Sequence, residues 1–145
     1  MKHSIRKLAD YVRFVASIER RLDEIKIGQG AILASLNRAK SDAKLSEYEF
    51  KVFSQWGEDG ILQHLTSAID IENRTFIEFG VEDFYESNCR FLLMHSGWQG
   101  FVIDGSQKNI DRLQRSYFFW RYPLKARCGF VTAENVNSLL EEHID

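Results

Sequence analysis

The stretch FIEFGVEDFYESNCR, residues 76–90, begins as an apolar strand and ends in a polar loop. Its β-branched and aromatic residues favour a buried strand over 75–81. An acid and a glycine, Glu78 and Gly80, stand where that strand must end, and two more acids follow directly. The arrangement suits either a plain exit from a strand or a ligand site at the mouth of a sheet.

Two apolar runs downstream repeat this pattern. GFVIDGS and LKARCGFV are expected to be further strands, over 100–106 and 124–131. Helices are expected to alternate with the strands, over 86–96, 107–119 and from Thr132 onward. Alternation of this kind predicts an α/β fold, a partial Rossmann-like parallel sheet of about three strands with right-handed crossovers. Open sheets usually have more strands, so we expect this one to be incomplete or completed by something else.

Residues 5–40 are predicted to form one long helix ahead of the α/β part. Residues recur every seven positions in two offset apolar series, which is the pattern of a coiled coil. We call these ten residues the heptad seam: Leu8, Val15, Leu22, Gln29 and Leu36 in one series, and Tyr11, Ile18, Ile25, Ile32 and Ala39 in the other. Gln29 is the polar exception, and the glycines on either side of it predict a weak or kinked helix there.

The heptad seam leads us to expect a homo-oligomer formed through residues 5–40. Packing of a single amphipathic helix against its own domain is one alternative. Attachment of a basic helix to a membrane surface is another, and the acidic residues on the polar side of the helix argue against it.

Charge is divided unevenly between the helix and the globular part, which we place at residues 1–43 and 44–145. The first holds nine Lys/Arg and five Asp/Glu, and the second holds ten and sixteen. Because the globular part is acidic, binding to nucleic-acid phosphates is not expected there. Charges interrupt every apolar run, so neither a secretory signal nor a transmembrane helix is expected, and we predict a cytoplasmic protein.

Cysteine and histidine spacing predicts no metal site. Cys89 and Cys128 form no CxxC pair and are expected to be buried thiols in a reducing compartment. His64, His95 and His143 are scattered without metal-ligand spacing, so we expect them to be ordinary core or surface residues.

The first two strands deliver an acid and a glycine to the same edge of the sheet, where ligands of doubly wound folds bind. Asp104 follows Glu78 by 26 residues, near the spacing at which an acid meets the two hydroxyls of a ribose. A carboxylate suits that diol because it accepts two hydrogen bonds. Gly80 would let a ligand approach the backbone closely. We therefore expect a cofactor site built from Glu78, Gly80, Val81, Glu82, Asp104, Gly105 and Ser106.

The loop after Gly80 indicates which cofactor to expect. A dinucleotide site needs a G-x-G-x-x-G turn to cradle the pyrophosphate, and no second glycine follows here. Glu82 and Asp83 would repel phosphates. The loop suits a ligand with a positive end and no phosphate, which describes S-adenosylmethionine. NAD or a sugar nucleotide is the weaker alternative.

Three segments, FSQWGEDGIL, FIEFGVEDFYESNCRFLL and GWQGFVIDGS, occur in an order that resembles the class I methyltransferase domain of FkbM-like proteins. The resemblance spans residues 53–131 and implies an S-adenosylmethionine-dependent enzyme of the kind found with bacterial polysaccharide or glycan biosynthesis. It implies that Glu78 and Gly80 face the methionine end and that Asp104 holds the ribose. Asn88 matches a recurrent position of the family. The segment that would close over the cofactor contains Gln55, Glu58 and Asp59.

Two departures from the family limit what the resemblance implies. Glu82, Asp83 and Phe84 replace a small, glycine-containing turn, and no strand matches the family's fourth, which carries an acidic run beside the methyl-transfer centre. We therefore expect no identifiable catalytic residue here. The expected function is transfer of a methyl group to an oxygen of a glycan or similar small acceptor. The alternative is a non-catalytic oligomerisation or docking protein with a degenerate α/β domain.

Overall fold

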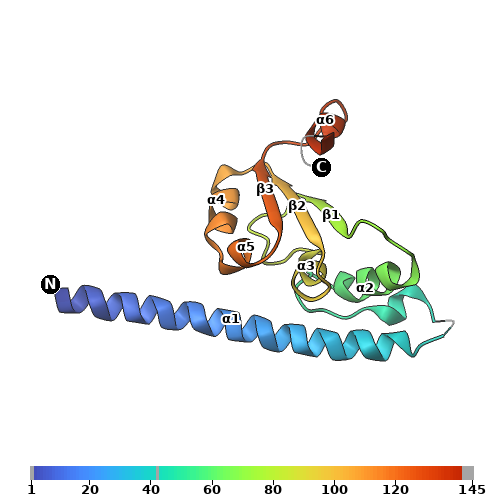
Figure 1. The fold of residues 1–145 in the computed structure, drawn as a ribbon, viewed down its shortest axis with the longest axis horizontal. Coiled ribbons are helices and arrows are strands. Elements are labelled where there is room, and N and C mark those ends of the chain that lie inside the picture. Colours follow the sequence, from blue (N-terminus) through green and yellow to red (C-terminus); the bar gives the residue numbers. More distant parts are fainter. Residues whose placement is uncertain (1, 42, 142–145) are drawn as a thin grey trace.

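The computed structural model describes residues 2–41 and 43–141, apart from the side chains of residues 2–5, 8, 9 and 16. The chain opens with a long helix, a 3₁₀ turn and a second helix: α1 (Lys2–Arg38), η1 (Leu45–Tyr48) and α2 (Glu58–Ala68). An alternating α/β part follows (Figure 1), made of β1 (Thr75–Phe79), α3 (Arg90–His95), β2 (Gln99–Asp104), α4 (Gln107–Arg115), α5 (Tyr117–Arg121), β3 (Leu124–Cys128) and α6 (Val136–Glu141).

The three strands form one parallel sheet in the order β1-β2-β3. Phe79 at the end of β1 pairs with Ile103, and Asp104 at the end of β2 pairs with Cys128. The carboxyl ends of all three strands therefore lie at one edge of the sheet. The predicted α/β fold with a three-stranded parallel sheet and flanking helices is confirmed.

Several predicted boundaries were too generous, and each has a local cause. The backbone turns at Gly80, where φ is +68°, and β1 ends one residue earlier. The helix predicted over 86–96 begins only at Arg90. Ser116 is extended and its hydroxyl caps α5, so the helix predicted over 107–119 is two helices. The last helix begins at Val136, after a turn in which Asn135 Oδ1 accepts from the Thr132 N–H at 2.8 Å.

The two faces of the sheet are covered unequally. One face packs on α3, α4 and α5 and forms the main hydrophobic core, to which α1 adds Ala34 from beyond α3. The other face carries a smaller cluster, in which Leu139 of α6 packs on Phe101 and Ile103. Within the described chain, no helix combines the length and apolar character that crossing a bilayer requires.

Helix α1 runs without a break through Gly28 and Gly30, where the sequence led us to expect a weak or kinked point. Gly30 is buried against the domain, and a Cβ at this position would lie 2.6 Å from Val52 Cγ2 and 2.7 Å from the Phe91 ring. The glycine that looked like a helix breaker is the residue that permits close packing of α1 on the core.

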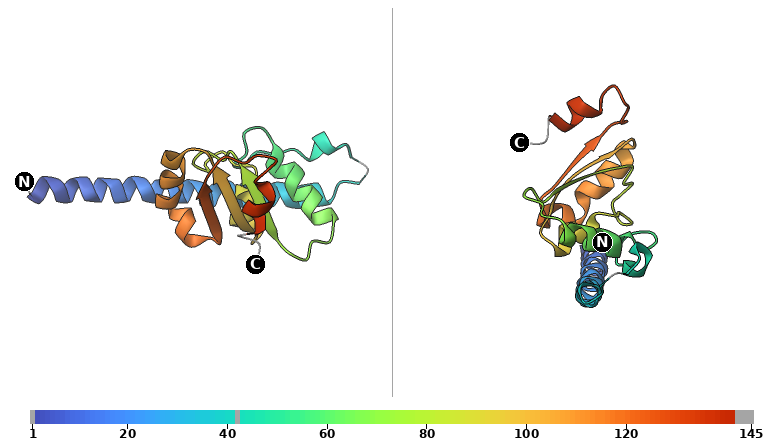
Figure 2. Two further views of the ribbon diagram at one scale, coloured as in Figure 1. Left: turned by 90° about the horizontal axis from the view of Figure 1, so that it is seen from above. Right: turned by 90° about the vertical axis from the view of Figure 1, so that its right-hand side faces the viewer.

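The heptad seam faces away from the domain. Tyr11, Ile25 and Ile32 are 65%, 67% and 64% exposed, whereas the opposite side of α1 buries Asp23 and Ala34. Seen along the axis of α1 (Figure 2, right), the domain lies on one side of the helix and leaves the other side open. The helix does pack on its own domain, but through the face opposite the seam. The coiled coil itself stays a prediction, and the side chain of Leu8 lies outside the described part.

Because Ala34 belongs to the main core, the segments predicted as 1–43 and 44–145 share one hydrophobic interior. The N-terminal half of α1 projects beyond the domain instead (Figure 1). The C-terminal half of α1 thus packs on the α/β part, and the N-terminal half extends away from it.

Candidate functional site

Glu78, in β1, binds the beginning of the segment that leads into α3. Its carboxylate accepts hydrogen bonds from the backbone N–H groups of Asn88 at 2.9 Å and Cys89 at 3.1 Å, and from the Ser87 hydroxyl. The acid at the mouth of the strand therefore fixes the far end of the loop 80–89. The sequence led us to expect that it would face a ligand directly.

Asp104, at the end of β2, binds the near end of the same loop. It is 7% exposed and accepts from the Glu82 N–H at 2.9 Å, the Ser106 N–H at 2.9 Å and the Asn109 side-chain amide at 3.1 Å. A carboxylate offers about four acceptor positions, so about one remains. The two ribose hydroxyls expected at Asp104 would have to displace at least one of these donors.

The backbone of the loop 80–89 is strained. Gly80, Glu82 and Phe84 all have positive φ, at 68°, 51° and 67°. Such values suit glycine and are unusual for a residue with a Cβ, above all for a bulky aromatic one. Phe84 is fully buried, so the core enforces the conformation. Glu82 and Phe84 thus adopt left-handed conformations within the very turn where the resembled family places a glycine. Strain of this kind concentrates at functional sites.

A shallow hollow of about 190 Å³ lies over this loop. It is lined by Gln55 and by residues of the loop, three of them acidic: Gly80, Val81, Glu82, Asp83, Tyr85 and Glu86. No atom lies within 4 Å of the position that a Cβ on Gly80 would take, so the glycine leaves open space. Arg112 pairs with Asp83 at 2.8 Å and offsets one of the charges. The hollow is acidic and open.

Gly105 and Ser106, also predicted for the site, have local partners. A Cβ on Gly105 would lie 2.6 Å from the Phe130 ring, so this glycine serves a packing contact. The Ser106 hydroxyl caps α4 by accepting from the Asn109 N–H at 3.4 Å. Val81 is buried beneath the loop, and the exposed Asn88 contributes its backbone N–H to Glu78.

The segment before α2 contains the two other predicted acids. Asp59 is buried, and its Oδ2 accepts from the N–H groups of residues 52–54 at 2.7–2.8 Å. Glu58 accepts from the N–H groups of Trp56 and Gly57, and these bonds, that from Gly57 first, lower its carboxyl pKa. Both acids shape the turn. Gln55 is the residue of this segment that lines the hollow.

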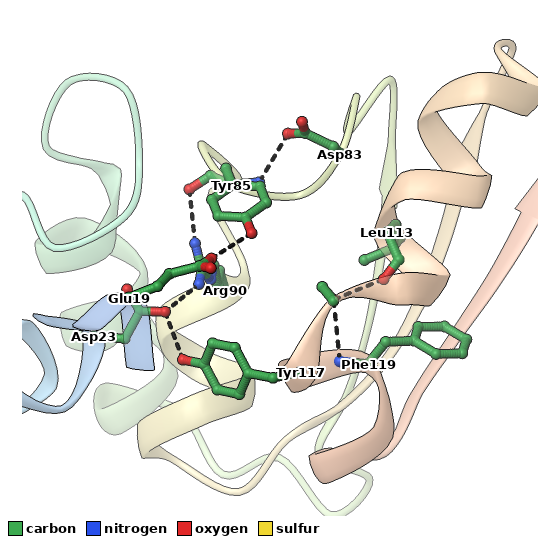
Figure 3. A network of polar contacts seen from close by, with 9 residues as sticks. Glu19, Asp23, Asp83, Tyr85, Arg90, Leu113, Tyr117 and Phe119 are labelled. Carbon is green, nitrogen blue, oxygen red and sulfur yellow. Dashed lines mark hydrogen bonds and ion pairs between the residues drawn. The ribbon is translucent and has the colours of Figure 1, made fainter. Parts of the chain in front are cut away.

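A partly buried polar network joins α1 to the loop (Figure 3). Arg90 donates to Asp23 at 2.5 Å and to the Tyr85 carbonyl at 3.1 Å. The Tyr117 hydroxyl donates to the same Asp23 carboxylate at 2.5 Å, and Tyr85 donates to Glu19. Burial, followed by these carboxylates, raises the pKa of both tyrosine hydroxyls, which keeps them protonated as donors.

Aromatic rings surround the Arg90 guanidinium within this network. Its centre lies 4.2 Å from the Phe53 ring centroid and 4.3 Å from that of Phe118. No sequence pattern indicates this network, because its members are 67 and 94 residues apart in the chain.

The cysteines and histidines have structural surroundings. Cys89 and Cys128 are half-buried, less than predicted, and burial raises the pKa of the Cys89 thiol. His64 and His95 stack on Tyr48 and Phe91 with centroids 3.5 and 4.8 Å apart, while His143 lies outside the described residues. Over the described ranges, no three His, Cys, Asp or Glu side chains gather in a way that could hold a metal ion.

Comparison with models of protein families, with curated proteins and with solved structures returned no match. The case for a function therefore depends on the geometry of the carboxyl edge and on the sequence resemblance.

Proposed function

We propose that the carboxyl edge of β1 and β2 binds S-adenosylmethionine, and that the protein belongs to a methyltransferase system acting on an oxygen of a glycan or similar small acceptor. The observation that carries the proposal is the acidic hollow over a strained loop that both strand-end acids hold in place. The acceptor class comes from the resemblance to FkbM-like proteins alone.

The charge of the hollow supports a cationic ligand. Glu82 and Glu86 are exposed there, and each favours a sulfonium or an amino group by direct attraction. The same charges oppose the phosphates of NAD or a sugar nucleotide. Pockets for whole cofactors usually measure about 300–1,000 Å³. A hollow of about 190 Å³ therefore matches one end of S-adenosylmethionine, the methionine end, over the open space at Gly80.

Each residue has a definite task in this proposal. Glu78 and Asp104 hold the loop, and the remaining acceptor position of Asp104 meets one ribose hydroxyl. Gln55 approaches the ligand from the other side of the hollow. Bound S-adenosylmethionine supplies the electrophilic methyl group, and the protein contributes mainly by positioning the acceptor against it. We assign no catalytic residue.

Isothermal titration calorimetry of the chain with S-adenosylmethionine and S-adenosylhomocysteine tests the proposal. We expect binding of both, tighter for the cationic S-adenosylmethionine, and loss of binding in Asp104→Ala. Because Asp104→Ala also releases the loop, Glu86→Lys gives a cleaner test, since Glu86 is exposed. Reversing that charge is expected to weaken S-adenosylmethionine binding roughly five- to tenfold.

Glu72→Lys is the matched control, because Glu72 is exposed and does not line the hollow. It is expected to leave binding unchanged. A folded wild-type chain that binds neither ligand, or that binds NAD in preference, would contradict the proposal.

A further inference from the structure

The heptad seam is the largest feature of the described chain that the proposed cofactor site does not use. Its residues follow one side of α1, exposed from Tyr11 to Leu36. The stretch rises about 38 Å along the helix at 1.5 Å per residue. A row of exposed apolar side chains of this length marks an interaction surface.

The placement of the domain on α1 leaves the seam available to a second helix. In a coiled coil, the positions opposite the seam face outward. Asp23, Gly30 and Ala34 occupy those outward positions, and they are the ones buried against the domain. A second helix on the seam and the α/β part on the opposite face can therefore be present together, with the domains outermost.

We infer that the seam binds α1 of a second copy of this chain, in the antiparallel direction. An antiparallel helix pair is a two-fold interface in which residue i meets j and j meets i. Full overlap of the seam sets Leu22 against Ile25 of the second copy. The remaining layers follow from that register, as Val15 against Ile32, Tyr11 against Leu36, and Gln29 against Ile18.

Residues flanking the seam match in this register by charge, apolarity and size. Glu19 lies beside Lys26 of the second copy, and the pair occurs twice by symmetry. Glu19 also accepts from Tyr85 of its own chain, and Lys26 Nζ lies 5.7 Å from the centroid of its own Phe53 ring, so both side chains stand between the domain and the seam. The other flanking pairs set an apolar residue against an apolar one or a large residue against a small one. They are Val12 with Leu33, Phe14 with Ser35, and Arg21 with Gly28, and Leu33 also packs on the core of its own chain.

The parallel direction fits less well. It would pair Gln29 with itself, which is favourable, but it would set Arg21 against Lys26, and Phe14 against Glu19. In the antiparallel pair, Gln29 meets Ile18 of the second copy, so its amide has no amide partner across the seam and must turn toward solvent. The charges and sizes of the residues that flank the seam therefore favour the antiparallel direction over the parallel one.

Light scattering during gel filtration of the full chain tests the pairing. We expect twice the mass of one chain at micromolar concentration. Ile25→Lys should give a monomer that stays folded, because Ile25 projects away from its own domain. Arg20→Glu, an exposed change on the polar side of the helix, is the control and should remain a dimer. A monomeric wild-type chain would overturn the inference, and so would a monomer that sediments with vesicles of anionic phospholipid, which would identify a membrane surface.

Lys26→Glu tests the direction. In the antiparallel pair it faces Glu19 of the second copy, and dimerisation should weaken several-fold. In a parallel pair it would face Arg21 and dimerisation should strengthen, which would overturn the antiparallel assignment.

Cysteine cross-linking provides an independent measurement of direction. Leu22→Cys chains mixed with Ile25→Cys chains should form disulfide-linked dimers under mild oxidation, while neither variant alone should do so. The wild-type chain, with Cys89 and Cys128 only, is the background. Cross-linking of Ile25→Cys with itself would show a parallel pair instead.

Discussion

Glu82 has a backbone conformation that is unusual for a residue with a side chain. Its φ of 51° lies in the region that glycine occupies without strain, and its N–H donates to Asp104 at 2.9 Å. An L residue in this region costs roughly 1–2 kcal/mol. The side chain at this position is therefore kept despite a conformational cost, which accords with a role for its charge in the hollow.

Replacing Glu82 with glycine is expected to raise the free energy of unfolding by about 0–1 kcal/mol. Relief of strain in the folded state offsets the entropy that glycine adds to the unfolded chain. Urea denaturation measures this. Glu86→Gly is the matched control in the same loop, where φ is not positive, and it is expected to destabilise by about 0.5–1 kcal/mol. Equal destabilisation by both changes would show that Glu82 is not strained.

A buried charge pair adds to the apolar contacts that dock α1 on the domain. Arg90 is 1% exposed, and Asp23, its partner on α1, also accepts from Tyr117. Within the described chain, Arg90 Nε has no hydrogen-bond partner. The rings of Phe53 and Phe118 surround the guanidinium, so water cannot easily replace the lost carboxylate if Asp23 is removed.

Asp23→Ala is expected to lower the free energy of unfolding by roughly 3–5 kcal/mol, because it leaves a buried cation without its counter-charge. Equilibrium denaturation in urea measures the loss. Asp10→Ala, on the exposed part of α1, is the control and should change stability by less than about 0.5 kcal/mol. Changing both partners to apolar residues, Asp23→Leu with Arg90→Met, should cost less than Asp23→Ala alone. A larger cost for the double change would contradict this account.

The sequence predicted the elements better than the contacts between them. Strand-helix alternation identified the three parallel strands, because apolar runs and turn residues are local signals. It could not show that Glu78 and Asp104 bond the loop 80–89, since an acid at a strand end looks the same whether it meets a ligand or a backbone N–H. Gly30 was interpreted as a weak point in α1 because its partners, Val52 and Phe91, are remote in sequence.

At the scale of the whole molecule, α1 is divided into two halves with different roles. The half that bears Asp23, Gly30 and Ala34 packs on the domain, and the N-terminal half projects past it. The predicted boundary near residue 43 therefore separates the heptad pattern from the α/β pattern in the sequence, but both segments contribute to one hydrophobic core.

Deleting residues 2–16 is expected to leave the α/β part folded, whereas deleting residues 2–38 is expected to unfold it. The second deletion exposes the core and removes Asp23, the buried partner of Arg90. Far-UV circular dichroism and a thermal melt of the two shortened chains measure this. A cooperative melt of the chain that lacks residues 2–38 would show that the α/β part is independently stable.

The 94-residue separation between Asp23 and Tyr117 has a consequence during synthesis. At roughly 5–20 residues per second, the ribosome needs about 5–20 s to make Tyr117 after it has made Asp23. During that interval Asp23 lacks its Tyr117 donor, and the heptad seam of α1 is exposed throughout. Chaperone binding, or pairing between neighbouring chains made on one message, can therefore compete with docking of the nascent helix.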